Sequence, residues 1–93
     1  MNKLITEMIQ GESYQSYSIG EYIVRAVDVC NGRPTFKYTR IEMSGALDRL
    51  AAGESIDSIV QGYRGRVSRV AIIEAIRLVT SRFIETLPVL EAA

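Results

Sequence analysis

Residues 55–83 have the sequence SIDSIVQGYRGRVSRVAIIEAIRLVTSRF, which holds the clearest structural signal in the chain. Apolar side chains recur every three or four residues on both sides of a short polar break, and this spacing predicts two helices joined by a tight turn. We expect the first helix at 56–62 and the second from Ser68 to about Glu85. We predict that Ser55 and Ser68 are the N-cap residues of these helices, because a serine hydroxyl can accept a hydrogen bond from an early backbone N–H.

A further helix is predicted just upstream, at about residues 43–52. Its apolar positions share one helical face and are Met43, Ala46, Leu47, Leu50 and Ala51. Gly53 follows, and glycine closes a helix at low cost in the left-handed conformation. Three helices with short connections resemble a helix-turn-helix unit, in which the last helix enters the major groove of DNA.

A small β element is expected before the helices. Partial alternation and β-branched residues predict a strand at 22–24 and a second extended piece at 27–29. Asn31-Gly32 is a strong turn signal, since both residues tolerate positive φ, and another extended stretch is expected at 35–41. The predicted fold class is therefore mainly α: a three-helix bundle of helix-turn-helix type with a small N-terminal β element.

The first 20 residues are weakly patterned. Leu4, Ile5, Met8 and Ile9 recur at a spacing compatible with a short helix, and residues 11–20 are typical of a loop or of a segment that packs on a partner. We divide the chain into a weakly structured or partner-binding segment, a helix-turn-helix domain with short strands at its start, and a C-terminal tail: residues 1–20, 21–85 and 86–93.

Length and composition narrow the sources of stability. A chain of 93 residues forms one domain with a thin stability margin. Cys30 is the only cysteine and there is no histidine, so neither an internal disulfide nor a zinc site or other cofactor is expected. Oligomerisation is the remaining supplement. No segment approaches the ~20 apolar residues of a membrane helix, and we expect a cytoplasmic protein that does not bind membranes.

Catalysis has little support in the sequence. Histidine, the commonest general base, is absent, and no glycine-rich phosphate loop is present. Carboxylate pairs such as Glu42 with Asp48, or Glu54 with Asp57, are explained by solvated helix faces and helix starts. We therefore predict a binding protein rather than an enzyme, with no small-molecule substrate.

Arginines around the predicted turn are the candidate DNA contacts. Residues 33–69 carry a net charge of +3, whereas the whole chain has none. Arginine can bind a phosphate or the edge of guanine through two hydrogen bonds. The predicted DNA contacts lie on the turn and along the last helix: Arg64, Arg66, Ser68, Arg69 and Arg77. Glu74 is a further exposed candidate on the same helix.

The same region also fits a module that binds only protein. Val70 and Ile73 lie where a DNA reader usually presents polar groups, and they suit a protein contact or additional core. A DNA-binding protein requires Arg69 and Arg77 exposed on one face with Arg66. A protein-interaction module would bury Val70 and Ile73 against a second chain.

From Tyr22 to about Phe83 the chain resembles the domain-of-unknown-function 433 family. The residues that carry the resemblance are Ile23-Val24, Val29-Cys-Asn-Gly-Arg-Pro-Thr-Phe-Lys-Tyr-Thr-Arg-Ile41, Leu50-Ala-Ala-Gly-Glu-Ser-Ile-Asp-Ser-Ile-Val60 and Ser68-Arg69. Arg33 replaces a common lysine, and the connection at 64–67 lacks the more typical proline. Tyr38 stands where glycine is usual, and a residue with a Cβ is restricted where glycine is free.

The resemblance implies a homeodomain-like fold and a homodimer. It also implies an antitoxin role, in which the protein neutralises a PIN-like ribonuclease toxin and represses its own operon by binding DNA. A dimer-forming or structural role is implied for Arg33, Pro34, Phe36, Thr39, Arg40 and Ile41. Within that segment, Arg40 is expected to hold backbone or phosphate, or instead to form an ion pair with Asp48 or Glu42.

Overall fold

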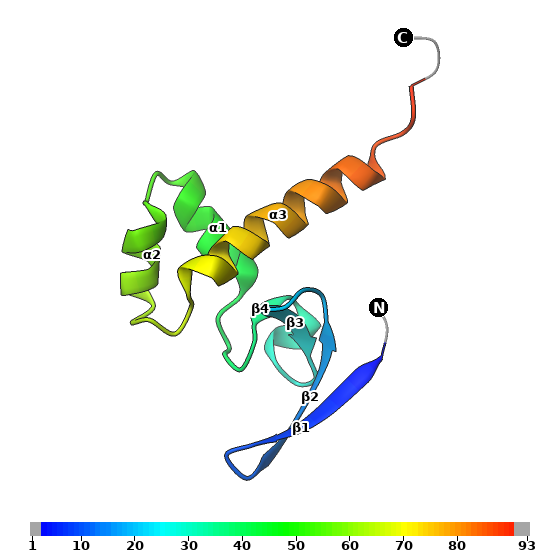
Figure 1. Ribbon diagram of the computed structural model, residues 1–93, viewed down its shortest axis with the longest axis vertical. Helices are drawn as coiled ribbons and strands as arrows, with labels where there is room; N and C mark the ends of the chain where they lie inside the picture. The colour runs from blue at the N-terminus through cyan, green and yellow to red at the C-terminus, as the bar shows by residue number, and fades with distance from the viewer. Residues whose placement is uncertain (1–2, 91–93) are drawn as a thin grey trace.

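The computed structural model describes residues 3–90, so the outermost residues of the predicted N-terminal segment and C-terminal tail fall outside it. Four strands precede three α-helices (Figure 1). The elements are β1 (Leu4–Ile9), β2 (Glu12–Ser18), β3 (Ile23–Ala26), the 3₁₀ turn η1 (Cys30–Gly32), β4 (Thr35–Phe36), α1 (Met43–Ala51), α2 (Ile56–Gly62) and α3 (Arg69–Thr86). The strands form one antiparallel sheet in chain order. The prediction of a mainly α fold is therefore wrong, because the chain is a mixed α/β protein.

The difference from the predicted mainly α fold comes mostly from the β1–β2 hairpin. Leu4 lies opposite Tyr17 and Ile9 opposite Glu12. The two connecting residues, Gln10 and Gly11, have φ of +52° and +80°, which is the type I′ geometry that matches the twist of paired strands. The short helix considered for this segment does not form. Its apolar residues occur in adjacent pairs, Leu4-Ile5 and Met8-Ile9, so they lie on both faces of the strand without the alternation that signals one, and Gln-Gly is a weaker turn signal than Asn-Gly.

The rest of the sheet matches the predicted β element in part. Asn31 and Gly32 have φ of +54° and +77°, which confirms the predicted turn. The extended piece expected at 27–29 is wrong, because Asp28 turns the chain with φ of +60°. The stretch expected at 35–41 is a strand only over β4.

The three helices lie where the sequence places them. The α2 bounds are those predicted, and α1 and α3 each end within one residue of the predicted position. The Ser55 hydroxyl accepts a hydrogen bond from Ser58 N at 3.0 Å, and the Ser68 hydroxyl accepts one from Ala71 N at 3.1 Å. Gly53 follows α1 with φ of +99°. Local capping and apolar spacing therefore account for the helical half.

One core joins the sheet to the helices. Ile23 of β3 and Phe36 of β4 are buried with residues of all three helices and the α2–α3 turn, namely Ala46, Ile59, Val67, Ala71, Ile72 and Ala75. Glu74 on α3 adds a polar link: its carboxylate accepts hydrogen bonds from Glu21 N and Tyr22 N, both at 2.8 Å. The start of β3 is thereby fixed against α3.

Two elements extend beyond this core. Figure 1 shows the tip of the β1–β2 hairpin on one side and the C-terminal half of α3 on the other. The radius of gyration is 15.1 Å, whereas a compact domain of this length has about 12 Å. No helix within residues 3–90 is long and apolar enough to cross a bilayer.

Candidate nucleic-acid interface

The turn between α2 and α3 is closed by its own backbone. Gly65 N donates to Val60 O at 3.0 Å and Arg66 N donates to Tyr63 O at 3.1 Å. Arg64 and Gly65 both have positive φ. Val67, which lies two residues after Gly65, is buried in the core. This geometry leaves the side chains of Arg64 and Arg66 exposed on a fixed turn.

The first residues of α3 continue this surface. The Ser68 hydroxyl accepts the hydrogen bond from Ala71 N that caps the helix, and its O–H group can still donate to a phosphate. Arg69 Nη1 lies 2.8 Å from Asp57 Oδ1 on α2, and both side chains are largely exposed. An exposed ion pair is weak, so Arg69 can exchange this partner for a phosphate at little cost.

The remaining candidates on α3 do not all join this group. Arg77 is exposed but lies eight residues from Arg69, about 12 Å further along the helix axis. Glu74 faces the start of β3 rather than solvent, so it is a structural residue. Val70 is 55% exposed, and Ile73 is half-buried. Arg64, Arg66 and Arg69 are therefore exposed and close in sequence, whereas Arg77 lies apart, so the requirement that a DNA-binding protein present Arg66, Arg69 and Arg77 on one face is met only in part.

The segment at 33–41 is used largely within the chain. Phe36 is a core residue, and Pro34 O accepts a hydrogen bond from Met43 N at 2.9 Å. Thr39 is buried; its hydroxyl donates to Phe36 O at 2.8 Å and accepts from Ile41 N at 2.9 Å. These bonds shape the loop that leads into α1.

The ion pair in this segment is made by Arg33, and not by Arg40 with Glu42 or Asp48. Arg33 binds both carboxylate oxygens of Glu42, at 2.7 and 3.2 Å, and these hydrogen bonds hold the pKa of Glu42 below its ordinary value. Glu42 is thus occupied by Arg33. Arg40 is exposed, and its carbonyl oxygen accepts from Cys30 Sγ at 3.4 Å.

Arg49 connects α1 to the start and end of α2. It donates two hydrogen bonds to Glu54, at 2.7 and 2.8 Å, and lies over the ring of Tyr63 with 4.9 Å to its centroid. The hydrogen bonds from Arg49 lower the pKa of Glu54. This arginine orders the helices behind the candidate surface and is not itself a candidate contact.

Tyr38 occupies the position where the resemblance described above implies a glycine. Its φ is +66°, so it keeps a conformation that glycine adopts freely. The hairpin holds it there: Tyr38 N donates to Tyr14 Oη at 3.1 Å, and Tyr38 Oη donates to Glu7 Oε2 at 2.9 Å. The Tyr14 and Tyr38 rings lie 5.2 Å apart. Sequence reasoning missed this contact because it depends on a hairpin that was not predicted.

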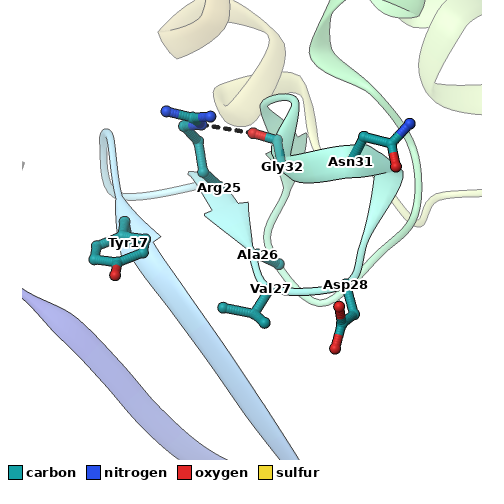
Figure 2. A pocket seen from close by; sticks show the side chains of 7 residues that line it. All are labelled: Tyr17, Arg25, Ala26, Val27, Asp28, Asn31 and Gly32. Carbon is teal, nitrogen blue, oxygen red and sulfur yellow. Dashed lines mark hydrogen bonds between the residues drawn. The ribbon is translucent and has the colours of Figure 1, made fainter.

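Two surface hollows were also not predicted. The first, of about 400 Å³, lies between β2, β3 and the turn that follows β3 (Figure 2). Arg25 Nε donates to Gly32 O at 2.5 Å, which commits this guanidinium to the turn. Figure 2 marks this hydrogen bond with a dashed line. The second, of about 460 Å³, lies beneath α3 and is lined by Ile19, Met43, Leu78, Val79 and Arg82 among others.

Neither hollow contains a combination of groups that indicates catalysis. Across residues 3–90, no three histidine, cysteine or acidic side chains are close enough to hold a metal ion. The first hollow has an amide, a carboxylate and a phenol, from Asn31, Asp28 and Tyr17, with no nucleophile between them. The exposed arginines at the α2–α3 turn remain the candidate site.

Comparisons with known proteins identify the family but no function. Searches of curated proteins and of solved structures give no significant match. A family model described as "Protein of unknown function (DUF433)" matches residues 23–77, more than half of the chain. The matched segment begins at β3 and ends within α3, so it spans the shared core and the arginine-bearing turn. The chain is therefore a member of the DUF433 family.

Proposed function

We propose that this protein is an antitoxin-like, homodimeric DNA-binding protein of the helix-turn-helix type. In this proposal α3 enters the major groove with its N-terminal end, and the turn before it contacts the phosphate backbone. The observation that carries the proposal is the placement of Arg64, Arg66 and Arg69. These three exposed guanidinium groups lie within six residues, on a hydrogen-bonded turn and the first position of the following helix.

The division of labour follows from the position of each side chain. Arg64 and Arg66 lie before α3, where a docked helix-turn-helix contacts phosphates. Arg69 opens α3 and can form two hydrogen bonds to a guanine edge after leaving Asp57. The net charge of zero means that binding depends on this local cluster and not on attraction by the whole molecule.

The test is fluorescence anisotropy of a labelled duplex from upstream of the gene, with an unrelated duplex, across a salt series. The upstream duplex should bind more tightly. Arg66→Ala should weaken both and reduce the slope of log K against log salt by about 1, the loss of one phosphate contact. Arg69→Ala should weaken mainly the specific duplex.

Arg82→Ala is the matched control, because Arg82 lies on α3 beside the second hollow and away from the turn. It should leave the affinity within about twofold and the salt slope unchanged. Absence of binding at low salt by a folded protein would refute the DNA-binding proposal.

A second candidate is a module that binds a PIN-like toxin without touching DNA. It is favoured by the exposed Val70 at the centre of the surface that would read bases, and by exposed Leu4, Ile5 and Met8 on the edge strand β1. An edge strand offers unpaired backbone groups to a partner chain. Calorimetric titration with a PIN-like ribonuclease tests this candidate, with Val70→Asp expected to weaken binding.

A further inference from the structure

The second hollow, beneath α3, combines an apolar floor with two arginine side chains. The floor is formed by Ile19, Met43 and Leu78, which are partly buried and pack against the shared core. Arg25 of β3 and Arg82 of α3 also line the hollow. Its volume of about 460 Å³ falls within the range of roughly 300–1,000 Å³ that small-molecule sites occupy. Volume and lining therefore fit a ligand with an apolar body and a charged end.

Backbone hydrogen bonds hold the floor in place. Met43 N donates to Pro34 O at 2.9 Å, and this bond ties the start of α1 to the residue before β4. Ile19 N donates to Ile23 O at 3.0 Å, which closes the turn between β2 and β3. The hollow is therefore formed before any ligand arrives, and a preformed site loses little conformational entropy on binding.

The positive charges at the hollow have little compensation within the chain. Arg82 takes part in none of the salt bridges within residues 3–90. Arg25 donates to the neutral carbonyl of Gly32, which orients its side chain and leaves its charge in place. No aspartate or glutamate of the described residues lines this hollow. Asp28 lines the first hollow instead, and Figure 2 shows it at the opposite end of that hollow from Arg25.

We propose that the second hollow binds a small aliphatic carboxylate. The hydrocarbon chain lies on the apolar floor, and the carboxylate lies between Arg25 and Arg82. A guanidinium group can hold both oxygens of a carboxylate through two hydrogen bonds. A hollow lined by charges of one sign also raises the local concentration of the opposite ion. Each methylene group that the floor buries should strengthen binding by up to about fourfold.

The size of the hollow favours a free ligand over a docked protein. Eight residues line it, whereas a standard protein–protein interface engages roughly 20–30 residues on each partner. The α2–α3 turn with its exposed arginines is formed by other residues, so this site is separate from the candidate nucleic-acid interface. The proposal therefore does not rest on the proposed function.

An NMR titration of the isotopically labelled full chain with octanoate, without DNA or a protein partner, tests the proposal. For a ligand of this size we expect a dissociation constant on the order of 1 mM. Chemical-shift changes should centre on the hollow, at Ile19, Leu78 and Val79. Octylammonium has the same hydrocarbon chain with the opposite charge and should bind at least about tenfold more weakly, because both arginines repel it. Equal binding of the two probes would overturn the role of the arginines.

Substitutions at exposed positions of α3 test the two parts of the site. Arg82→Ala should weaken octanoate binding about fivefold, as expected for one exposed ion pair, and Arg82→Glu should weaken it further by repulsion. Val79→Asp places a carboxylate in the apolar lining and should abolish binding. Arg77→Ala is the matched control, because Arg77 is an exposed arginine of the same helix outside the hollow, and it should leave the affinity within about twofold.

Circular dichroism should show that all four variants are folded, since the substituted side chains lie outside the buried core. Absence of shift changes with octanoate, changes spread evenly over the chain, or equal weakening by Arg77→Ala and Arg82→Ala would overturn the proposal. The outcome is distinguishable from that of the DNA titration, because Arg82→Ala is expected to weaken octanoate binding and to leave DNA binding unchanged.

Discussion

Glu74 should make a large contribution to stability, although its sequence position suggested a DNA contact. Its two carboxylate oxygens each accept a hydrogen bond of 2.8 Å from the backbone, one from Glu21 N and one from Tyr22 N. Replacement by alanine removes both acceptors at once. The start of β3 then loses its polar connection to α3, while the buried Ile23 remains in the core.

The magnitude follows from the exposure of the two donors. A hydrogen bond to a charged group contributes about 1.5–3 kcal/mol, but water can replace the acceptor at the exposed Glu21 N. We count the partly buried hydrogen bond from Tyr22 N in full and the exposed one from Glu21 N only in small part. Glu74→Ala should then lower the free energy of unfolding by about 2–3 kcal/mol. In a domain of this size that corresponds to a fall in Tm of roughly 10–20 °C. Glu74→Gln keeps one acceptor and should lose about half as much.

Urea denaturation followed by circular dichroism measures the change, with Asp48→Ala as a control at an exposed helical carboxylate, expected within about 0.5 kcal/mol of the unmodified protein. Gly20 gives a second test, because an added Cβ there would lie 2.6 Å from Glu74 Oε1. Gly20→Ala should destabilise the unmodified protein and have less effect when Glu74 is already alanine. A loss below 0.5 kcal/mol for Glu74→Ala, or strictly additive effects, would refute the reasoning.

Three other predictions concern caps, the hairpin and pH. Ser68→Ala should cost about 1 kcal/mol in urea denaturation, because the Ala71 N–H loses its acceptor; no loss would contradict the cap. Tyr38→Phe should cost about 0.5–1.5 kcal/mol and speed hydrogen exchange in β1 and β2 but not in α3, because only the bond to Glu7 is lost. Hydrogen bonds from Arg33 and Arg49 hold the pKa values of Glu42 and Glu54 in the folded protein below the ordinary value of 4.5. The two ion pairs therefore stabilise the folded state fully above pH 4.5, and this contribution is lost as the pH falls through the pKa values of the folded state. Urea midpoints should therefore fall between pH 5 and pH 3, and less so in a Glu42→Gln, Glu54→Gln variant; equal falls would contradict the pairing.

The helical half could be predicted because its signals are local. Ser55 and Ser68 lie within four residues of the N–H groups that they cap, and Gly53 adopts its left-handed conformation directly after α1. Apolar spacing then identifies the faces that the core buries. None of this required knowledge of the rest of the chain.

The sheet could not be predicted to the same degree because its determinants are distant in sequence. Tyr38 is held by Glu7 and Tyr14, which lie 31 and 24 residues away. The apolar residues of β1 recur at a helical spacing and do not alternate as in a half-buried strand, so only pairing with β2 makes this segment extended. The arginines of the candidate site were identified by residue type, whereas the pairing of Arg69 with Asp57 depends on how α2 and α3 pack.

The division between the matched segment and the rest of the chain has a consequence for partner choice. The family match covers residues 23–77, and every residue of the buried apolar core cluster lies within it. The hairpin before it and the part of α3 after it instead carry much of the exposed apolar surface, including Met8, Phe83 and Ile84. The fold thus depends on the matched segment, and the flanking elements supply surfaces that another chain can cover. Differences in partner between members of the family are therefore expected to arise from these flanking elements, while the turn with Arg64 and Arg66 lies inside the segment that they share by definition.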